Sequence, residues 1–268
     1  MFLERLISGV ILVILAVACI GTGGNLLLGV VGLLSLIGQF ELYRVFKLEK
    51  TSLAYIGYIG TIVYELLLFW NKEAWIEVYL LAVLLVFLIT YVISYPMYVF
   101  SQIAMIYTGL MYVTMSLSCL YQVRCMEGGI YLVWIIFIAA WGSDTCAYCV
   151  GKLIGKHKIP SPLSPKKTIE GCSGGVIGAA LLAFLYGWLL QDKLLPFGYL
   201  PWNFLVMGAI GGILSQIGDL TASAIKRNYD IKDYGKLIPG HGGIMDRFDS
   251  ILFTGPLTYI FLNILQTI

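Results

Sequence analysis

Long runs of apolar residues, separated by short polar segments, make up most of this sequence. A helix needs about 20 apolar residues to cross the hydrocarbon core of a bilayer. Stretches that meet or approach this length are found at 5–20, 24–43, 53–70, 75–94, 102–121, 129–151, 173–190, 201–226 and 249–267. The pattern predicts an all-α, polytopic integral membrane protein with about nine transmembrane helices.

The distribution of basic residues predicts the orientation of these helices, because Lys and Arg gather in cytoplasmic loops. With nine helices and a cytoplasmic N-terminus, three of the 17 Lys and Arg residues lie on the outer side of the membrane: Lys72, Arg124 and Lys193. We therefore expect an outer C-terminus and two long cytoplasmic loops, at 152–172 and 227–248.

The composition agrees with a membrane protein, since 59% of the 268 residues are hydrophobic and 12% are charged. Soluble domains are usually about 45–50% apolar and about 25% charged. The net charge of +2 is not gathered on a water-soluble domain, so no nucleic-acid partner is expected. Cys146 and Cys149 form a C-x-x-C inside an apolar run with no second pair, which predicts neither a zinc site nor a disulfide.

Three acids inside predicted membrane helices are candidate functional residues, because a charged side chain there is costly and indicates function by default. Asp144 precedes Lys152 by eight residues, and Asp219 precedes Lys226 by seven. At about 1.5 Å per residue, both lie about 10–12 Å below the cytoplasmic boundary. Glu65 lies in the outer half of its helix and is interpreted as a packing or interface residue, with a lone proton-linked group as the alternative.

The helix predicted at 201–226 carries a polar stripe. The helical period places these polar residues on one face: Ser215, Gln216, Asp219, Ser223 and Lys226. Because lipid cannot satisfy such a stripe, we expect it to face a water-filled cavity or another polar helix. Interhelical hydrogen bonding is the alternative.

Charged residues concentrate between Ser223 and Asp249, where 27 positions hold five basic and four acidic residues. Asp246 and Asp249 stand three residues apart where the last helix begins, so their carboxylates can point the same way. Hard cations such as Mg²⁺ prefer oxygen ligands together with phosphate and water. Asp219, Asp246 and Asp249 are therefore the predicted ligands of one or two such ions.

The same segment also carries features of a phosphate site. The glycine-rich run 239–243 lets backbone amides approach an anion, and the helix after it offers free N–H groups. His241 either donates to a phosphate or stabilises the loop. Nearby basic residues supply the charge that phosphate needs: Lys226, Arg227, Lys232 and Arg247.

A second basic loop, at 161–171, lies on the same predicted face of the membrane and contains Lys166 and Lys167. It could bind a polyphosphate or a lipid head group. The alternative is a solvated inner loop whose lysines set the topology.

The segment from Ser223 to Asp249 resembles the signature of the phosphatidate cytidylyltransferases, also called CDP-diacylglycerol synthases. Every position of that signature is present: Ser223, Lys226, Arg227, Lys232, Asp233, Pro239, His241, Gly242, Gly243, Asp246, Arg247 and Asp249. Three further stretches are similar to the family: 141–145, 164–171 and 216–219. The resemblance covers the C-terminal half, whereas the first 130 residues or so share only hydrophobicity with the family.

The resemblance implies a Mg²⁺-dependent nucleotidyltransferase of phospholipid biosynthesis, which transfers CMP from CTP to phosphatidic acid and releases pyrophosphate. It implies metal ligation by Asp219, Asp246 and Asp249, and catalytic roles for Lys226, Arg227, Arg247 and Asp144. The implied substrate-binding residues are Ser223, Lys166, Lys167, Lys232, His241, Gly242 and Gly243.

The resemblance also implies an organisation and a location for the protein. We expect residues 1–128 to form a scaffold for lipid access or dimerisation, and 129–268 to form the catalytic region. The expected location is the cell inner membrane, with membrane lipids around the protein and the active site at the cytoplasmic side. A homodimer is compatible with the resemblance, because family members often pair, but no residue in the sequence requires it.

Two other functions remain open. A polyprenol kinase type of enzyme would use CTP to phosphorylate a lipid alcohol and would release CDP. A secondary transporter for an anionic solute would use the acids as cation sites near the bilayer midplane, between inverted repeats. The sequence shows no internal repeat and its charges gather near one face, which disfavours the transporter.

Overall fold

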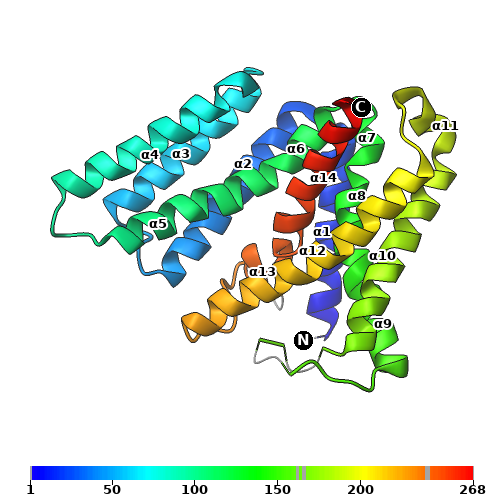
Figure 1. Cartoon of the computed structure of the whole chain (residues 1–268). Coiled ribbons are helices and arrows are strands. Elements are labelled where there is room, and N and C mark those ends of the chain that lie inside the picture. Colours follow the sequence, from blue (N-terminus) through cyan, green and yellow to red (C-terminus); the bar gives the residue numbers. More distant parts are fainter. Residues whose placement is uncertain (1, 161–162, 165–166, 239–241, 268) are drawn as a thin grey trace. The chain divides into compact units, whose positions relative to one another are not determined.

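The computed structural model of the chain describes residues 2–160, 163–164, 167–238 and 242–267, and its regular elements are helices (Figure 1). The first elements are α1 (Phe2–Thr22), α2 (Gly24–Val45), α3 (Ser52–Phe69), α4 (Ile76–Ile93), α5 (Phe100–Gly109), the π-helical η2 (Leu110–Met115) and α6 (Ser116–Cys125). They are followed by α7 (Gly129–Leu132), α8 (Trp134–Phe137), the π-helical η3 (Ile138–Gly142), α9 (Ser143–Ile154), α10 (Ile169–Leu189), α11 (Gln191–Leu194), α12 (Pro201–Asn228), α13 (Met245–Phe248) and α14 (Ile251–Thr267).

The helices confirm the all-α, multi-pass membrane architecture. Within the described chain, seven helical segments are long and apolar enough to cross a membrane: Gly24–Val45, Ser52–Phe69, Glu73–Ile93, Phe100–Cys125, Gly129–Ile154, Ile169–Leu189 and Pro201–Asn228. Two shorter apolar helices, Gly9–Thr22 and Ile251–Thr267, coincide with the first and last predicted spans. The count of nine spans and the cytoplasmic N-terminus stay predictions.

Packing divides the chain into two compact units. The first unit contains Met1–Ser118 and Asp233–Asp246, and the second contains Cys119–Lys232 and Arg247–Ile268. We call Asp233–Asp246 the signature loop, because it carries part of the 223–249 motif. The functional division predicted at residue 128 stays a prediction.

The first unit combines an apolar core with buried hydrogen bonds between helices. Its core residues come from α2, α3, α4, α5 and the loops that join them: Tyr43, Leu48, Leu53, Ala54, Phe87, Tyr98, Ile103 and Ile106. Thr61 donates to Gln39 Oε1 over 2.8 Å, and Gln39 Nε2 donates to Thr114 Oγ1 over 3.1 Å. These fully buried polar side chains satisfy one another, as polar groups in a membrane helix bundle must.

Glu65 takes part in a similar contact in the first unit. Its Oε1 accepts a hydrogen bond from Ser118 Oγ over 2.8 Å, which joins α3 to α6. This contact agrees with its interpretation as a packing residue.

The second unit is organised around α10, which packs on α9 and runs beside α12 (Figure 1). Small residues allow the helices to approach closely, as is common between membrane helices. A Cβ at Gly208 of α12 would lie 2.6 Å from the backbone oxygen of Ala179 and 2.6 Å from Ala183 Cβ on α10. Glycine is therefore required where these two backbones meet.

Gly208→Ala should destabilise the second unit by about 1–3 kcal/mol, because an overpacked contact against backbone cannot relax without moving a helix. The free energy of unfolding can be measured by denaturant titration in micelles. Gly29→Ala is the matched control, since a Cβ at Gly29 of α2 meets nothing within 4 Å. Equal stability of both variants would contradict the close packing of α10 on α12.

Candidate active site

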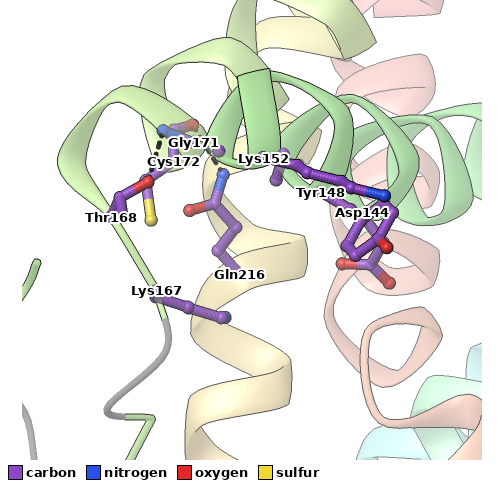
Figure 2. Close-up of a pocket in the computed structure, with 10 residues that line it drawn as sticks. Asp144, Tyr148, Lys152, Lys167, Thr168, Gly171, Cys172 and Gln216 are labelled. Carbon is purple, nitrogen blue, oxygen red and sulfur yellow. Dashed lines mark hydrogen bonds between the residues drawn. The ribbon is translucent and has the colours of Figure 1, made fainter. Parts of the chain in front are cut away.

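A pocket of about 390 Å³ opens in the second unit. Its lining comes from α9, α12 and the start of α10: Asp144, Ala147, Tyr148, Gly151, Lys152, Lys167, Thr168, Gly171, Cys172 and Gln216. Figure 2 shows an acid and two lysines among these side chains. The pocket thus offers charges of both signs beside apolar walls.

The ion pair between Lys167 and Asp219 links the second basic loop to α12. Lys167 Nζ lies 2.7 Å from Asp219 Oδ2, and the two side chains are 25% and 34% exposed. Asp219 also interacts electrostatically with Asp144 and Asp249. Asp144, Asp219 and Asp249, which we call the acidic cluster, thus lie within electrostatic range of one another and of a lysine.

Local structure determines the position of Lys167. Thr168 caps the N-terminus of α10, and its Oγ1 accepts a hydrogen bond from Gly171 N over 3.1 Å (Figure 2). The backbone oxygen of Lys167 accepts from Ile159 N over 2.9 Å. Both bonds hold the chain around Lys167, so its side chain reaches Asp219 from an anchored backbone.

Asp249 is placed by the packing of α14 on α12. A Cβ at Gly218 would lie 2.6 Å from the backbone oxygen of Asp249, so the chain passes close to α12 beside Asp219. Asp249 Oδ1 accepts from Ser250 N over 2.8 Å, and Ser250 Oγ donates to the backbone oxygen of Ser215 over 3.2 Å. Asp249 thus lies beside the part of α12 that carries Asp219, and a metal site shared by these two residues stays a prediction.

The polar stripe of α12 divides into two parts. Ser215 Oγ donates to the backbone oxygen of Ala140 over 3.4 Å, and Gln216 Nε2 donates to that of Cys172 over 2.9 Å (Figure 2). Interhelical hydrogen bonding, the alternative reading, therefore accounts for these two residues. Further along α12, Asp219 belongs to the acidic cluster, and Lys226 interacts electrostatically with Asp249.

Asp246 lies in the first unit, at the end of the signature loop. It is 8% exposed, and its Oδ2 accepts from Tyr234 N over 2.8 Å and from Gly243 N over 2.9 Å. Its carboxylate therefore shapes the loop that carries Gly242 and Gly243. Each of its carboxylate oxygens can accept more than one bond, so these contacts are compatible with a ligand role.

The donor set can be compared with what Mg²⁺ requires. Within the described ranges, no three His, Cys, Asp or Glu side chains are grouped closely enough to hold a metal ion. Mg²⁺ is usually bound by one or two carboxylates, with water and substrate phosphate completing the shell. Asp219 and Asp249 fit this requirement in the second unit, and Asp246 as a third ligand stays a prediction.

Comparison with known proteins extends the match beyond the C-terminal half. The profile described as the cytidylyltransferase family matches residues 3–265. The chain belongs to the cytidylyltransferase family. A phosphatidate cytidylyltransferase of Bacillus subtilis is 38% identical over 188 residues, which cover 69% of this chain and 67% of the relative. One of Staphylococcus aureus is 32% identical over 265 residues, covering 96% and 98%.

The cytidylyltransferase signature is shared between the two units. Six of the predicted site residues in the signature belong to the second unit: Ser223, Lys226, Arg227, Lys232, Arg247 and Asp249. The first unit holds Gly242, Gly243 and Asp246. Lys166 and His241 lie outside the described residues. Arg227, Lys232 and Arg247 are exposed.

Some residues that shape this cytidylyltransferase site were missed by sequence reasoning. Thr168 was quoted only as part of a similar stretch, although a threonine before an apolar run is an N-cap signal. Glu41 of α2 was not considered, although it lies inside the helix predicted at 24–43. An acid inside an apolar run was the signal that could have identified it.

Proposed function

We propose that this protein is a phosphatidate cytidylyltransferase that converts CTP and phosphatidic acid to CDP-diacylglycerol and pyrophosphate. The similarity to relatives of that name over nearly the whole chain supports the assignment. The structural observation that carries it is the Lys167–Asp219 pair beside Asp144 and Asp249. In this arrangement a lysine that can bind phosphate lies next to carboxylates of the kind that bind hard cations.

The reaction requires no nucleophile from the protein. An oxygen of the phosphatidic acid phosphate attacks the α-phosphorus of CTP. The bond from that phosphorus to the α,β-bridging oxygen breaks, and pyrophosphate leaves with this oxygen. The protein therefore acts by positioning the two phosphates and stabilising charge, as in other phosphoryl transfers.

The acidic cluster and the lysines divide these tasks. Lys167 pairs with negative charge at the reacting phosphates, and Asp144 orients the lysines that share its pocket. Asp219 and Asp249 would hold Mg²⁺, which neutralises phosphate charge and brings both substrates together when bound. Lys226, Arg227 and Arg247 supply further positive charge for pyrophosphate.

The proposed location follows from the basic loops. Lys152 and Lys167 lie beside the pocket, and positive residues mark the cytoplasmic side of a membrane protein. CTP would enter from the cytosol and phosphatidic acid sideways from the inner leaflet of the cell membrane. A homodimer stays a prediction, to be tested by molar mass in detergent.

Purified protein in detergent should convert CTP, phosphatidic acid and Mg²⁺ to equal amounts of pyrophosphate and a CDP-lipid. Release of CDP with a phosphorylated lipid would replace this proposal by a lipid kinase. The proposal would be overturned if a folded protein left CTP unconverted even when a membrane extract supplied natural lipids as substrates.

A further inference from the structure

Glu41 is a buried acid of the first unit that lies near the C-terminal end of α2. It is 3% exposed. An ionisable side chain buried in a membrane helix is retained only where it has specific partners, and it indicates function by default. Its partners are therefore informative.

Those partners belong to the signature loop. Glu41 Oε2 accepts a hydrogen bond from Met245 N over 2.9 Å. The carboxylate also lies against Gly235 and Gly243, and a Cβ on either glycine would overlap it. One carboxylate thus contacts the loop at its beginning and at its end.

Arg44, which lies almost one turn further along α2, forms another hydrogen bond to the same loop. Its Nη2 donates to the backbone oxygen of Tyr234 over 2.5 Å. Two charged side chains of α2, one negative and one positive, therefore bind backbone groups of opposite polarity. Such charge-assisted hydrogen bonds are stronger than neutral ones.

These contacts lead directly to Asp246. Asp246 Oδ2 accepts from the backbone amides of Tyr234 and Gly243. Glu41 packs against Gly243, and Arg44 binds Tyr234. The orientation of the Asp246 carboxylate thus depends on two residues that α2 holds in place.

We infer that Glu41 is a positioning residue that holds the signature loop so that Gly242, Gly243 and Asp246 are presented in their reactive arrangement. This inference rests on the proposed cytidylyltransferase function. Glu41 acts through the loop and has no contact with substrate in this role. Its loss should reduce turnover without weakening the binding of phosphatidic acid.

Glu65 provides the comparison, because it is a partly buried acid in the first unit with a different partner. It bonds the side chain of Ser118 on α6 and not the signature loop. If burial of an acid mattered only for packing, Glu41→Gln and Glu65→Gln would have similar effects. If Glu41 positions the loop, they differ.

Two measurements on the full-length protein test the inference. In Glu41→Gln, which keeps the shape of the side chain, amides of residues 233–238 and 242–246 should exchange hydrogen about 10-fold faster while α9 and α10 are unchanged. The kcat should fall by about 10–100-fold, with KM for phosphatidic acid within about 2-fold of the wild type. Glu65→Gln should leave both loop exchange and kcat unchanged.

Gly235→Ala tests the same contact from the loop, since its Cβ would displace the Glu41 carboxylate. It should reproduce the faster exchange and the lower kcat. Wild-type exchange in Glu41→Gln, a normal kcat despite faster exchange, or equal kcat losses in Glu41→Gln and Glu65→Gln would each overturn the inference. If the wild type makes no CDP-lipid, the proposed function fails, and the exchange data alone decide whether Glu41 holds the loop.

Discussion

Asp219→Asn is expected to lower kcat for CDP-lipid formation by about 10³-fold, the largest effect of any single substitution considered. Asparagine keeps the size of the side chain but removes the charge that pairs with Lys167 over 2.7 Å. It also removes a carboxylate oxygen of the type that Mg²⁺ requires. Initial rates of pyrophosphate release at saturating CTP and phosphatidic acid measure the effect.

Metal removal should have a similar consequence in the wild type. EDTA should stop turnover and added Mg²⁺ should restore it, whereas Asp219→Asn should respond only weakly to a large excess of Mg²⁺. Asp192→Asn, which changes an exposed acid of α11, is the control for charge removal in the same unit. A fully active Asp219→Asn protein would contradict a role for Asp219 in the active site.

Lys167→Met is expected to lower kcat/KM for CTP by about 10²-fold, because methionine keeps an unbranched chain but cannot neutralise phosphate. Lys158→Met, which changes an exposed lysine in the same predicted cytoplasmic loop at 152–172, should retain normal activity. The comparison separates a specific charge from the general attraction of a basic loop for anions. Equal losses in both variants would favour the topology-setting role of the loop.

The double variant of Lys167→Met and Asp219→Asn tests whether the two residues of the ion pair are functionally coupled. Residues that act together are strongly non-additive, so the double variant should be about as slow as Asp219→Asn alone. Multiplication of the two separate losses would show that the residues act independently.

The apolar runs predicted the helices well, because a bilayer demands long uninterrupted segments whose backbone bonds are internal. The run predicted at 201–226, for example, is α12, Pro201–Asn228. The sequence did not predict the π-helical η2 and η3, because they depend on local packing rather than on hydrophobicity. The separation of residues 233–246 from their sequence neighbours also escaped prediction, because it depends on tertiary contacts.

Part of the candidate site could be predicted, because acidic residues are rare in membrane helices and therefore indicate functional positions. Asp144 and Asp219 were placed at one depth by counting residues, and the structure brings them within electrostatic range of each other. Their depth in the membrane stays a prediction. The pairing of Asp219 with Lys167 joins positions more than 50 residues apart, and nothing in the helical period specifies it. Ser215 and Gln216 share the stripe with Asp219 but bind neighbouring backbones, which a periodicity argument cannot separate.

The hydrogen bond between Glu41 and Met245 has a consequence for biosynthesis. These residues are 204 positions apart, so ribosomes working at about 5–20 residues per second make Met245 about 10–40 s after Glu41. During that interval α2 has already been made, but Glu41 lacks the backbone amide of Met245 as a hydrogen-bond donor. The first unit can therefore complete its hydrogen bonds only after Met245 has been made.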